Sequence, residues 1–176
     1  MYKLKAPLTK DKIGKLRTGE ALVYDGILYT ARDQAHRRFA ELIKKNKKLP
    51  IDLKGQIIYY CGPNPAAPGK IIGACGPTTS QRMDRFAPAL MKAGVLGMVG
   101  KGERSPDVVR AIKKYRAVYF ATYAGCGALL SRYVKNKKIV CFEDLGTEAV
   151  FALNVSNFPL LVAVDCMGGS IYDERR

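Results

Sequence analysis

The sequence predicts one α/β domain in which a mixed sheet is flanked by helices. Apolar runs and amphipathic stretches alternate through the middle of the 176-residue chain, as strands and helices do in such domains. Both ends of the chain have runs that are more typical of strands than of helices. No repeat, low-complexity tract or second-domain boundary interrupts residues 1–176, which is a common length for one domain.

The first thirty residues are predicted to form an arm and a hairpin. Residues 1–20 are polar and have few apolar anchors, so we interpret them as an N-terminal arm with one short element at most. Two β-rich runs, 21–24 and 27–30, then flank Asp25-Gly26. This pair is typical of a two-residue turn between antiparallel strands.

Residues 31–45 have the pattern of an amphipathic helix. Its apolar positions form one stripe at helical spacing: Ala35, Phe39, Leu42 and Ile43. Arg32 and His36 lie one turn apart and share a different face. Because a cation opposes the helix dipole at this end, Arg32 is interpreted as a ligand-binding residue. The alternative is a solvent-facing arginine beside a surface histidine.

The rest of the chain alternates between strands and helices. The predicted strands are residues 56–61, 70–75, 95–99, 117–122, 138–142, 149–155 and 160–165. One helix follows the 76–83 turn and ends near residue 93, another spans 105–115, and a short one ends at 133. Prolines in the 62–69 loop indicate a fixed connection between the first two of these strands.

The segment from Gly73 to Met83 has the clearest functional pattern. Gly76-Pro77 ends an apolar run, and three hydroxyl side chains follow it: Thr78, Thr79 and Ser80. Hydroxyls at a helix start cap free N–H groups, and the helix dipole there attracts anions. Arg82 follows one turn later with a planar fork that suits a carboxylate. The pattern predicts an oxyanion-binding turn, although an ordinary capped helix has the same local signature.

Gly100-Lys101-Gly102 is a second candidate segment, because it directly follows a predicted strand. Open α/β sheets place their ligand sites at this end of their strands, and glycine lets the backbone approach a ligand closely. The segment does not match the G-x-x-x-x-G-K-[ST] phosphate loop, so no nucleotide site is inferred. Lys101 is therefore a candidate anion-binding cation.

Composition argues against several classes of protein. No run approaches the roughly 20 apolar residues of a membrane helix. The first ten residues lack the apolar core of a signal peptide, so we expect a cytoplasmic location. The cysteines are widely spaced and form no C-x-x-C pair: Cys61, Cys75, Cys126, Cys141 and Cys166. They predict reduced, buried thiols and no metal site in this chain.

The net charge of +15 suits an anionic partner, such as a nucleic acid, an acidic subunit or an anionic substrate. The densest lysine clusters, 44–48 and 135–138, contain no interleaved aromatic residues. Aromatic side chains on which bases stack are typical of single-strand binding surfaces. Nucleic-acid binding is therefore the less favoured interpretation, and an anionic substrate with a protein partner is the favoured one.

Five motifs in order give the chain a family resemblance: Thr30–His36, Gly76–Met83, Gly100–Gly102, Glu148-Ala149 and Asn157–Pro159. With them the sequence resembles the β subunit, or C-terminal domain, of class I fumarate hydratases and tartrate dehydratases. The resemblance runs from about residue 4 to residue 172. It implies a swivelling β/β/α fold and a chain that is half of a hydro-lyase, inactive without its α subunit.

The resemblance also implies what each half supplies. A [4Fe-4S] cluster is expected on the α subunit, in an α2β2 assembly, and not on this chain. Arg32, Arg82 and Lys101 are expected to bind a substrate carboxylate, with Thr79 as a further binding hydroxyl. Thr78 aligns with a threonine proposed to transfer a proton and to contact substrate. For His36 we expect packing behind these residues, with a proton relay as the alternative.

Several functions remain open on these observations. Reversible hydration of fumarate to L-malate is the main hypothesis, and dehydration of L-tartrate is the close alternative. A basic nucleic-acid-binding module is an alternative from another class. A scaffold without activity is a third, which the presence of Arg32, Thr78, Arg82 and Lys101 disfavours.

Overall fold

Seven strands form one mixed sheet in the computed structural model, which describes residues 2–173. The strands are β1 (Tyr2–Lys5), β2 (Ala21–Thr30), β3 (Ile57–Tyr59), β4 (Gly97–Gly100), β5 (Val118–Ala121), β6 (Val134–Cys141) and β7 (Val150–Val164). The α-helices are α1 (Lys10–Gly14), α2 (Asp33–Lys44), α3 (Ala87–Lys92), α4 (Pro106–Tyr115) and α5 (Gly127–Leu130). Short 3-10 helices are η1 (Ser80–Met83), η2 (Ser131–Tyr133) and η3 (Glu143–Glu148). The predicted α/β fold, with a mixed sheet and flanking helices, is confirmed.

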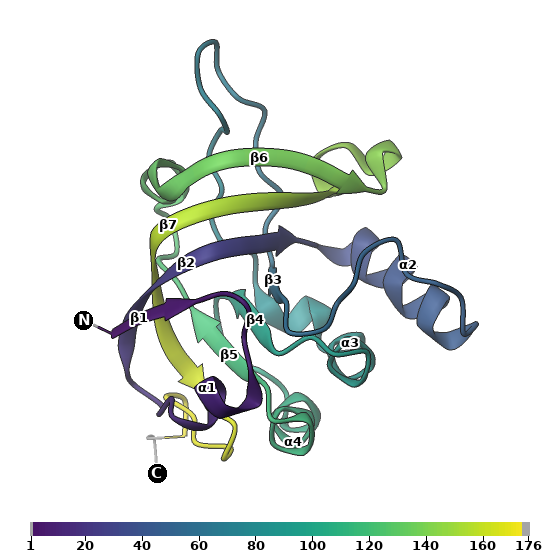
Figure 1. The fold of residues 1–176 in the computed structure, drawn as a ribbon, viewed down its shortest axis with the longest axis vertical. Helices are drawn as coiled ribbons and strands as arrows, with labels where there is room; N and C mark the ends of the chain where they lie inside the picture. The colour runs from purple at the N-terminus through teal and green to yellow at the C-terminus, as the bar shows by residue number, and fades with distance from the viewer. Residues whose placement is uncertain (1, 174–176) are drawn as a thin grey trace.

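The sheet closes on itself through the long strand β7 (Figure 1). Strands β1 to β5 run parallel to one another, in the order of the chain. Strand β7 is antiparallel to β5 at one end and to β2 along most of its length. The pairings therefore return to β2, and β1 and β6 extend the ring at its edges.

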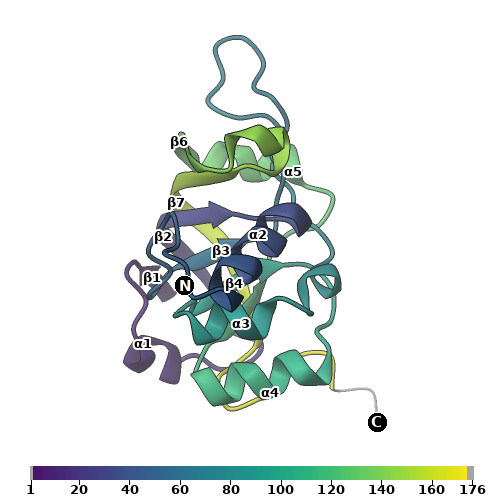
Figure 2. The ribbon, with the colours of Figure 1, turned by 90° about the vertical axis from the view of Figure 1, so that its right-hand side faces the viewer.

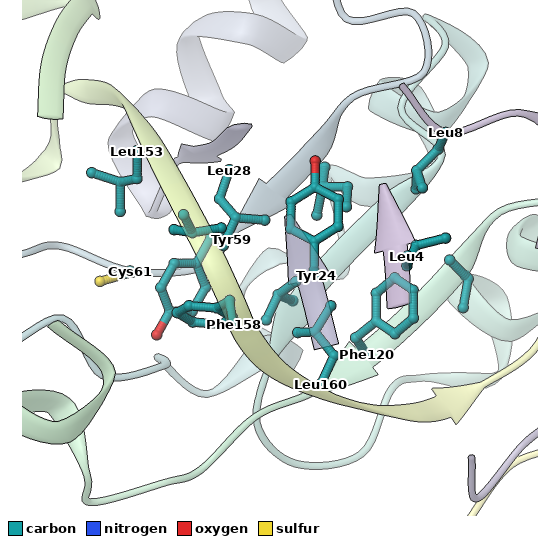
Figure 3. Packing of buried hydrophobic residues seen from close by; sticks show 14 of the residues in the cluster. Leu4, Leu8, Tyr24, Leu28, Tyr59, Cys61, Phe120, Leu153, Phe158 and Leu160 are labelled. Atoms are coloured by element: carbon teal, nitrogen blue, oxygen red, sulfur yellow. The ribbon is translucent and has the colours of Figure 1, made fainter. Parts of the chain in front are cut away.

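Two hydrophobic clusters hold this arrangement together. The interior of the ring is filled by large side chains that include Tyr24, Tyr59, Phe120 and Phe158 (Figure 3). Helices α2, α3 and α4 cover one outer side of the ring (Figures 1 and 2). The second cluster lies under them: it includes Phe39, Ile58, Leu90, Met98 and Ile112. Along β3, side chains alternate between the two clusters, as the period of a strand requires.

The predicted hairpin at Asp25-Gly26 is wrong, because β2 runs unbroken through this pair. The pairing of β2 with β7 shifts register between Tyr24 and Gly26, which makes the pair a β-bulge. The Asp25 carboxylate accepts the Asn157 N–H at 2.6 Å and pairs with the Lys3 ammonium at 2.6 Å. Gly26 is required there, since its φ is +148° and an added Cβ would lie 2.5 Å from the Tyr24 hydroxyl.

The expected N-terminal arm is instead part of the domain over residues 2–20. Strand β1 pairs with β2, and α1 packs on the ring. The apolar residues of this segment are buried: Leu4, Leu8, Ile13 and Leu16. Their spacing matches neither a long strand nor a long helix, so only the tertiary fold shows that they share one core.

Two strand predictions in the remainder also differ from the structure. Residues 70–75 lie in a loop that projects beyond β6 (Figure 1), where Asn64 bonds to Ala74 through its N–H and to Gly73 through its carbonyl. These bonds are made within the loop, and residues 70–75 add no strand to the sheet. The predicted strands 149–155 and 160–165 are joined in β7, because β2 pairs with both of them.

None of the helices within residues 2–173 has the length and apolar character needed to cross a membrane.

Candidate active site

The candidate residues lie at the edge where parallel strands β2, β3 and β4 end. Arg32 follows β2 by two residues, and Lys101 directly follows β4. Backbone bonds continue the ladder past the strand ends, from Ala31 N–H to the Tyr59 carbonyl and from Tyr60 N–H to the Val99 carbonyl. The carboxyl ends of parallel strands are where α/β sheets build their sites, so this edge is the place to expect one.

The turn around Thr78 is held across this same edge. Thr78 N–H donates to the Tyr60 carbonyl at 2.6 Å, and Ser80 N–H donates to the Lys101 carbonyl at 2.9 Å. Thr79 and Lys101 form a parallel β-bridge between these two bonds. The structure thus brings Thr78, Thr79 and Lys101 together, although they lie on segments more than twenty residues apart.

The predicted capped helix after this turn is replaced by two shorter pieces, η1 and α3. Thr79 stands at the cap position of η1 but makes no side-chain cap bond. Within residues 2–173 the hydroxyls of Thr78 and Thr79 have no hydrogen-bond partner, whereas the Ser80 hydroxyl is bonded to the Tyr119 hydroxyl at 2.9 Å. The two threonine hydroxyls are therefore available to a ligand, and Ser80 has a structural role.

Gly100 permits the close approach of this turn to β4. A Cβ at Gly100 would lie 2.0 Å from the Ser80 hydroxyl oxygen and 2.9 Å from the Tyr60 ring. Gly100→Ala should therefore lower the free energy of unfolding by about 1–3 kcal/mol, since buried overpacking has costs of this size. Denaturant unfolding measures it. Gly14→Ala is the control, because its Cβ would meet only the mobile end of Arg116; equal stability of both variants would contradict the prediction.

The Arg32 side chain is half-buried and lies against Gly62, where an added Cβ would be 2.9 Å from Arg32 Cδ. Its Nε is buried and has no hydrogen-bond partner among residues 2–173. The nearest carboxylate oxygen, on Glu148, lies 3.8 Å from its Nη2 and is only a loose ion-pair partner. The other Glu148 oxygen accepts the Gln34 N–H at 2.9 Å, so Glu148 caps α2. Arg32 thus retains an unsatisfied buried donor, which is unfavourable unless a ligand supplies an acceptor.

Arg82 differs from Arg32, because its guanidinium group already pairs with a carboxylate. Its Nε and Nη2 donate to the two carboxylate oxygens of Asp33 at 3.1 and 2.6 Å. The side chain is 49% exposed, so this pair faces solvent. Lys101, in contrast, makes no ion pair with any residue in 2–173, and its side chain is half-buried. Of the three predicted cations, Arg32 and Lys101 are therefore available for an anion, and Arg82 is neutralised by Asp33.

His36 is buried, contrary to the alternative of a surface histidine. Its Nδ1 donates to the Arg32 carbonyl at 2.9 Å, and its ring packs edge-on against Tyr60 at 5.2 Å between centroids. Burial lowers the pKa of His36 to about 4, so the ring is neutral at pH 7. The packing role expected for His36 agrees with these contacts, and they support the backbone of Arg32 from behind.

Burial of neutral His36 should make the chain less stable in mild acid. In the unfolded chain, His36 binds a proton with a pKa near 6.5. In the folded chain it binds a proton only near pH 4. The contribution of His36 to stability is therefore greatest above pH 6.5, and about 3 kcal/mol of it is lost as pH falls to 4. Urea unfolding at pH 7, 6, 5 and 4 measures this, with His36→Gln as the reference. A variant with the same slope as the wild type between pH 6.5 and 5 would contradict it.

The positions of the cysteines bear on where an iron–sulfur cluster could be held. Across the part of the chain that the structure describes, no three histidine, cysteine or acidic side chains gather as a metal-binding group. Cys61, Cys75 and Cys166 are buried, Cys141 is partly buried, and Cys126 is exposed. Burial also raises the pKa of the Cys75 thiol to about 12, which opposes formation of a metal-binding thiolate.

Three residues to which the sequence analysis assigned no role lie beside the candidates. Asp33 and Glu148 face the two arginines, and a buried arginine, Arg104, connects the segments that carry the other candidates. Asp33 could have been found as an acid beside Arg32, and Glu148 stands in one of the quoted motifs. Arg104 gives no sequence signal, because an arginine before a capping serine ordinarily faces solvent.

These features define an α/β domain with cationic and hydroxyl side chains, free of protein partners within residues 2–173, at the edge where its parallel strands end. The profile of the family described as "Fumarase C-terminus" matches residues 2–175. The chain belongs to this family.

Three relatives illustrate how the family is organised. The chain is 41% identical to the "Putative L(+)-tartrate dehydratase subunit beta" of Methanocaldococcus jannaschii, over 95% of this chain and 89% of that one. It is 34% identical to "Fumarate hydratase 1, mitochondrial" of Leishmania major over 99% of this chain, but covers only 32% of that protein. With "Fumarate hydratase class I, anaerobic" of Escherichia coli the identity is 34%, over 85% of this chain and 28% of the relative. The chain thus spans nearly all of one relative and about a third of the others.

Proposed function

We propose that this chain is the β subunit of a class I fumarate hydratase and completes an active site formed with an α subunit. The observation that carries the proposal is the buried Arg32 Nε, which has no acceptor within residues 2–173. It lies at the same strand edge as Lys101, Thr78 and Thr79, whose polar side-chain atoms are also unpaired there. Such a group of donors suits an anion that the free chain lacks.

In this proposal, Arg32 and Lys101 stabilise the negative charge of the substrate. Fumarate has two carboxylates, and its hydration passes through a carbanion-like species in which one carboxylate gains further negative charge. Cations that are already in place stabilise such charge without reorganising during the reaction. Arg82 joins them by exchanging Asp33 for a substrate carboxylate, which replaces one carboxylate on its fork with another.

Thr78 has the proton-transfer role, and Thr79 binds substrate through its hydroxyl. A free threonine hydroxyl is too weak a base at neutral pH, so Thr78 requires an activating group. We assign this group to a carboxylate of the α subunit. Thr78 itself is positioned by its own N–H, which the Tyr60 carbonyl holds at 2.6 Å.

The α subunit is the proposed holder of the [4Fe-4S] cluster, as the family resemblance implies. The support from this chain is that no three potential metal ligands gather within residues 2–173. One iron of such a cluster supplies Lewis-acid chemistry when it is present on that subunit. An α2β2 assembly is proposed, and its α surface should be acidic to complement a net charge of +15. The five free cysteines support a reducing, cytoplasmic compartment.

L-tartrate dehydration is the second candidate, and the name of the archaeal relative favours it. The same cations would bind the carboxylates of tartrate. The extra tartrate hydroxyl needs its own hydrogen-bond partner, and discrimination between the substrates depends on that partner. Thr79 and residues of the α subunit are the groups available for it.

Anaerobic turnover of fumarate and of L-tartrate tests the proposal. The chain is mixed with its α subunit after the cluster has been reconstituted, and each subunit alone is the control. We expect hydration of fumarate to L-malate only in the mixture. Preferred turnover of tartrate would select the second candidate. With the cluster intact, no turnover of either would refute both, and steeply salt-dependent RNA or DNA binding would then support the nucleic-acid module.

A further inference from the structure

A buried arginine stands where the segments of the candidate site meet. Arg104 is only 3% exposed, and its Nε donates to Asp84 Oδ1 at 2.7 Å. Its guanidinium carbon lies 5.2 Å from the centre of the Tyr60 ring and 4.9 Å from that of Tyr119. One cation therefore contacts a residue after β3, a residue of β5 and the end of η1.

The ion pair with Asp84 connects the Arg82 segment to the Lys101 segment. Asp84 directly follows η1, which contains Arg82. Its second carboxylate oxygen accepts the N–H of Ser105 at 2.6 Å, at the start of α4. One Asp84 oxygen thus accepts from the Arg104 side chain and the other from the Ser105 backbone, so the two segments are joined at two points.

The contact with Tyr60 extends this connection to Thr78 and Arg32. Arg104 Nη1 donates to the Tyr60 hydroxyl at 3.3 Å. The Tyr60 carbonyl accepts Thr78 N–H, and the Tyr60 ring packs against His36. His36 in turn bonds the carbonyl of Arg32. A shift of Tyr60 would therefore move the turn that carries Thr78 and the support of Arg32 together.

The contact with Tyr119 extends it to Lys101. The Tyr119 hydroxyl donates to the Gly102 carbonyl at 2.8 Å and accepts from the Ser80 hydroxyl at 2.9 Å. Ser80 N–H bonds the carbonyl of Lys101. Tyr119 thus holds the residue after Lys101 through its carbonyl and the residue after Thr79 through its hydroxyl.

This arrangement is poorly explained as a device for stability. Removing an arginine and an aspartate from water is unfavourable, and an apolar replacement of similar volume is often as stable. The Arg104 Nη2 is buried and has no hydrogen-bond partner within residues 2–173, which further lowers the stability of the folded chain. What Arg104 does achieve is simultaneous contact with Asp84, Tyr60 and Tyr119. These residues are in turn joined to the segments that carry Arg82, Thr78 and Lys101.

We propose that Arg104 is a positioning residue, which holds Thr78, Arg82 and Lys101 in register across the ends of β3 and β4. It acts through Asp84, Tyr60 and Tyr119 and does not touch substrate. The proposal rests on the proposed function for the identity of the substrate, but the register itself can be measured without turnover.

The first measurement is amide hydrogen exchange in the full chain, which needs no α subunit. Arg104→Met and Tyr119→Phe should increase exchange of the Thr78 and Ser80 amides at least about tenfold, because their local opening becomes easier. The Val118 amide is bonded to the Leu96 carbonyl within the sheet, and its exchange rate should remain unchanged. Arg110→Met is the matched control, since Arg110 lies on α4 with a 71% exposed side chain.

The second measurement is turnover in the reconstituted complex. Misplacement of a catalytic group by about 1 Å is worth roughly 100-fold in rate, so Arg104→Met should lower kcat/KM by about that factor. We expect KM to rise as well as kcat to fall, whereas partial unfolding would reduce only the active fraction and hence kcat. Arg104→Lys keeps the charge without the fork and should recover part of the loss.

The outcomes separate this proposal from the proposed function. Unchanged Thr78 and Ser80 exchange in folded Arg104→Met and Tyr119→Phe, with wild-type kcat/KM, would overturn the positioning role. If Arg104→Met does not fold, Tyr119→Phe and Arg104→Lys decide the question by the same readouts. If the wild-type complex turns over neither substrate, the proposed function fails, and amide exchange alone then decides whether Arg104 holds the register.

Discussion

Arg32→Met, in the complex with the α subunit, should lower kcat/KM for fumarate by about two to three orders of magnitude, or 2–4 kcal/mol. The reason is that the Arg32 Nε has no hydrogen-bond partner within residues 2–173, and in the proposed function the substrate supplies the acceptor. The same variant should unfold at the wild-type temperature or slightly above it, because it removes a buried donor without an acceptor. Steady-state kinetics and thermal unfolding of one preparation measure both quantities.

Arg37→Met is the matched control for this prediction, because Arg37 is an exposed arginine of the same helix. It should retain wild-type kcat/KM, which separates a local effect from the loss of one positive charge. Normal turnover in Arg32→Met would show that Arg32 is not a substrate ligand. A large drop in its unfolding temperature would instead mean that the loose Glu148 pair and the Gly62 contact stabilise the fold.

Thr78→Val should reduce kcat by about 100- to 10,000-fold with little change in KM, as expected for loss of a proton-transfer group. Valine keeps the branched shape of threonine and the N–H that bonds to the Tyr60 carbonyl, so the turn should remain in place. The hydroxyl has no partner within residues 2–173, and its removal should leave the free energy of unfolding nearly unchanged. The assay is initial-rate hydration in the reconstituted complex.

Thr78→Ser is the companion variant, because it restores a hydroxyl at the same position. It should recover most of the activity that Thr78→Val loses. If Thr78→Val raises KM and leaves kcat intact, Thr78 binds substrate without transferring a proton. Equal activity of the valine and serine variants would exclude any role for the hydroxyl.

Periodicity and local chemistry were sufficient where one element determines its own form. The helix predicted over 105–115 is α4, and the stripe through Phe39 correctly marks the face that α2 buries. Both segments bury one face against the sheet, so their sequences show the helical period directly. Lys101 was likewise placed correctly at a strand end, because it follows an apolar run that forms β4.

Local rules failed where distant segments compete for the same backbone groups. Asp25-Gly26 has the signature of a hairpin turn, yet β1 and β7 pair with both edges of β2 and make the pair a bulge. Ser and Thr after Gly76 have the signature of caps, yet bonds to Tyr60 and Lys101 draw the turn across the sheet. In both places the tertiary partners provide more hydrogen bonds than the local conformation would.

The fold class and the family follow from the sequence alone, which also supplies the candidate residues for binding a dicarboxylate. These depend on periodicity and on motifs, which are written along the chain. Only the tertiary structure decided which cations are available: Asp33 neutralises Arg82, while the Arg32 Nε remains unpaired within residues 2–173. It also decided that Arg104 is buried between two tyrosine rings. The physical reason is that pairing and desolvation depend on the distances between segments, and the order of residues does not contain those distances.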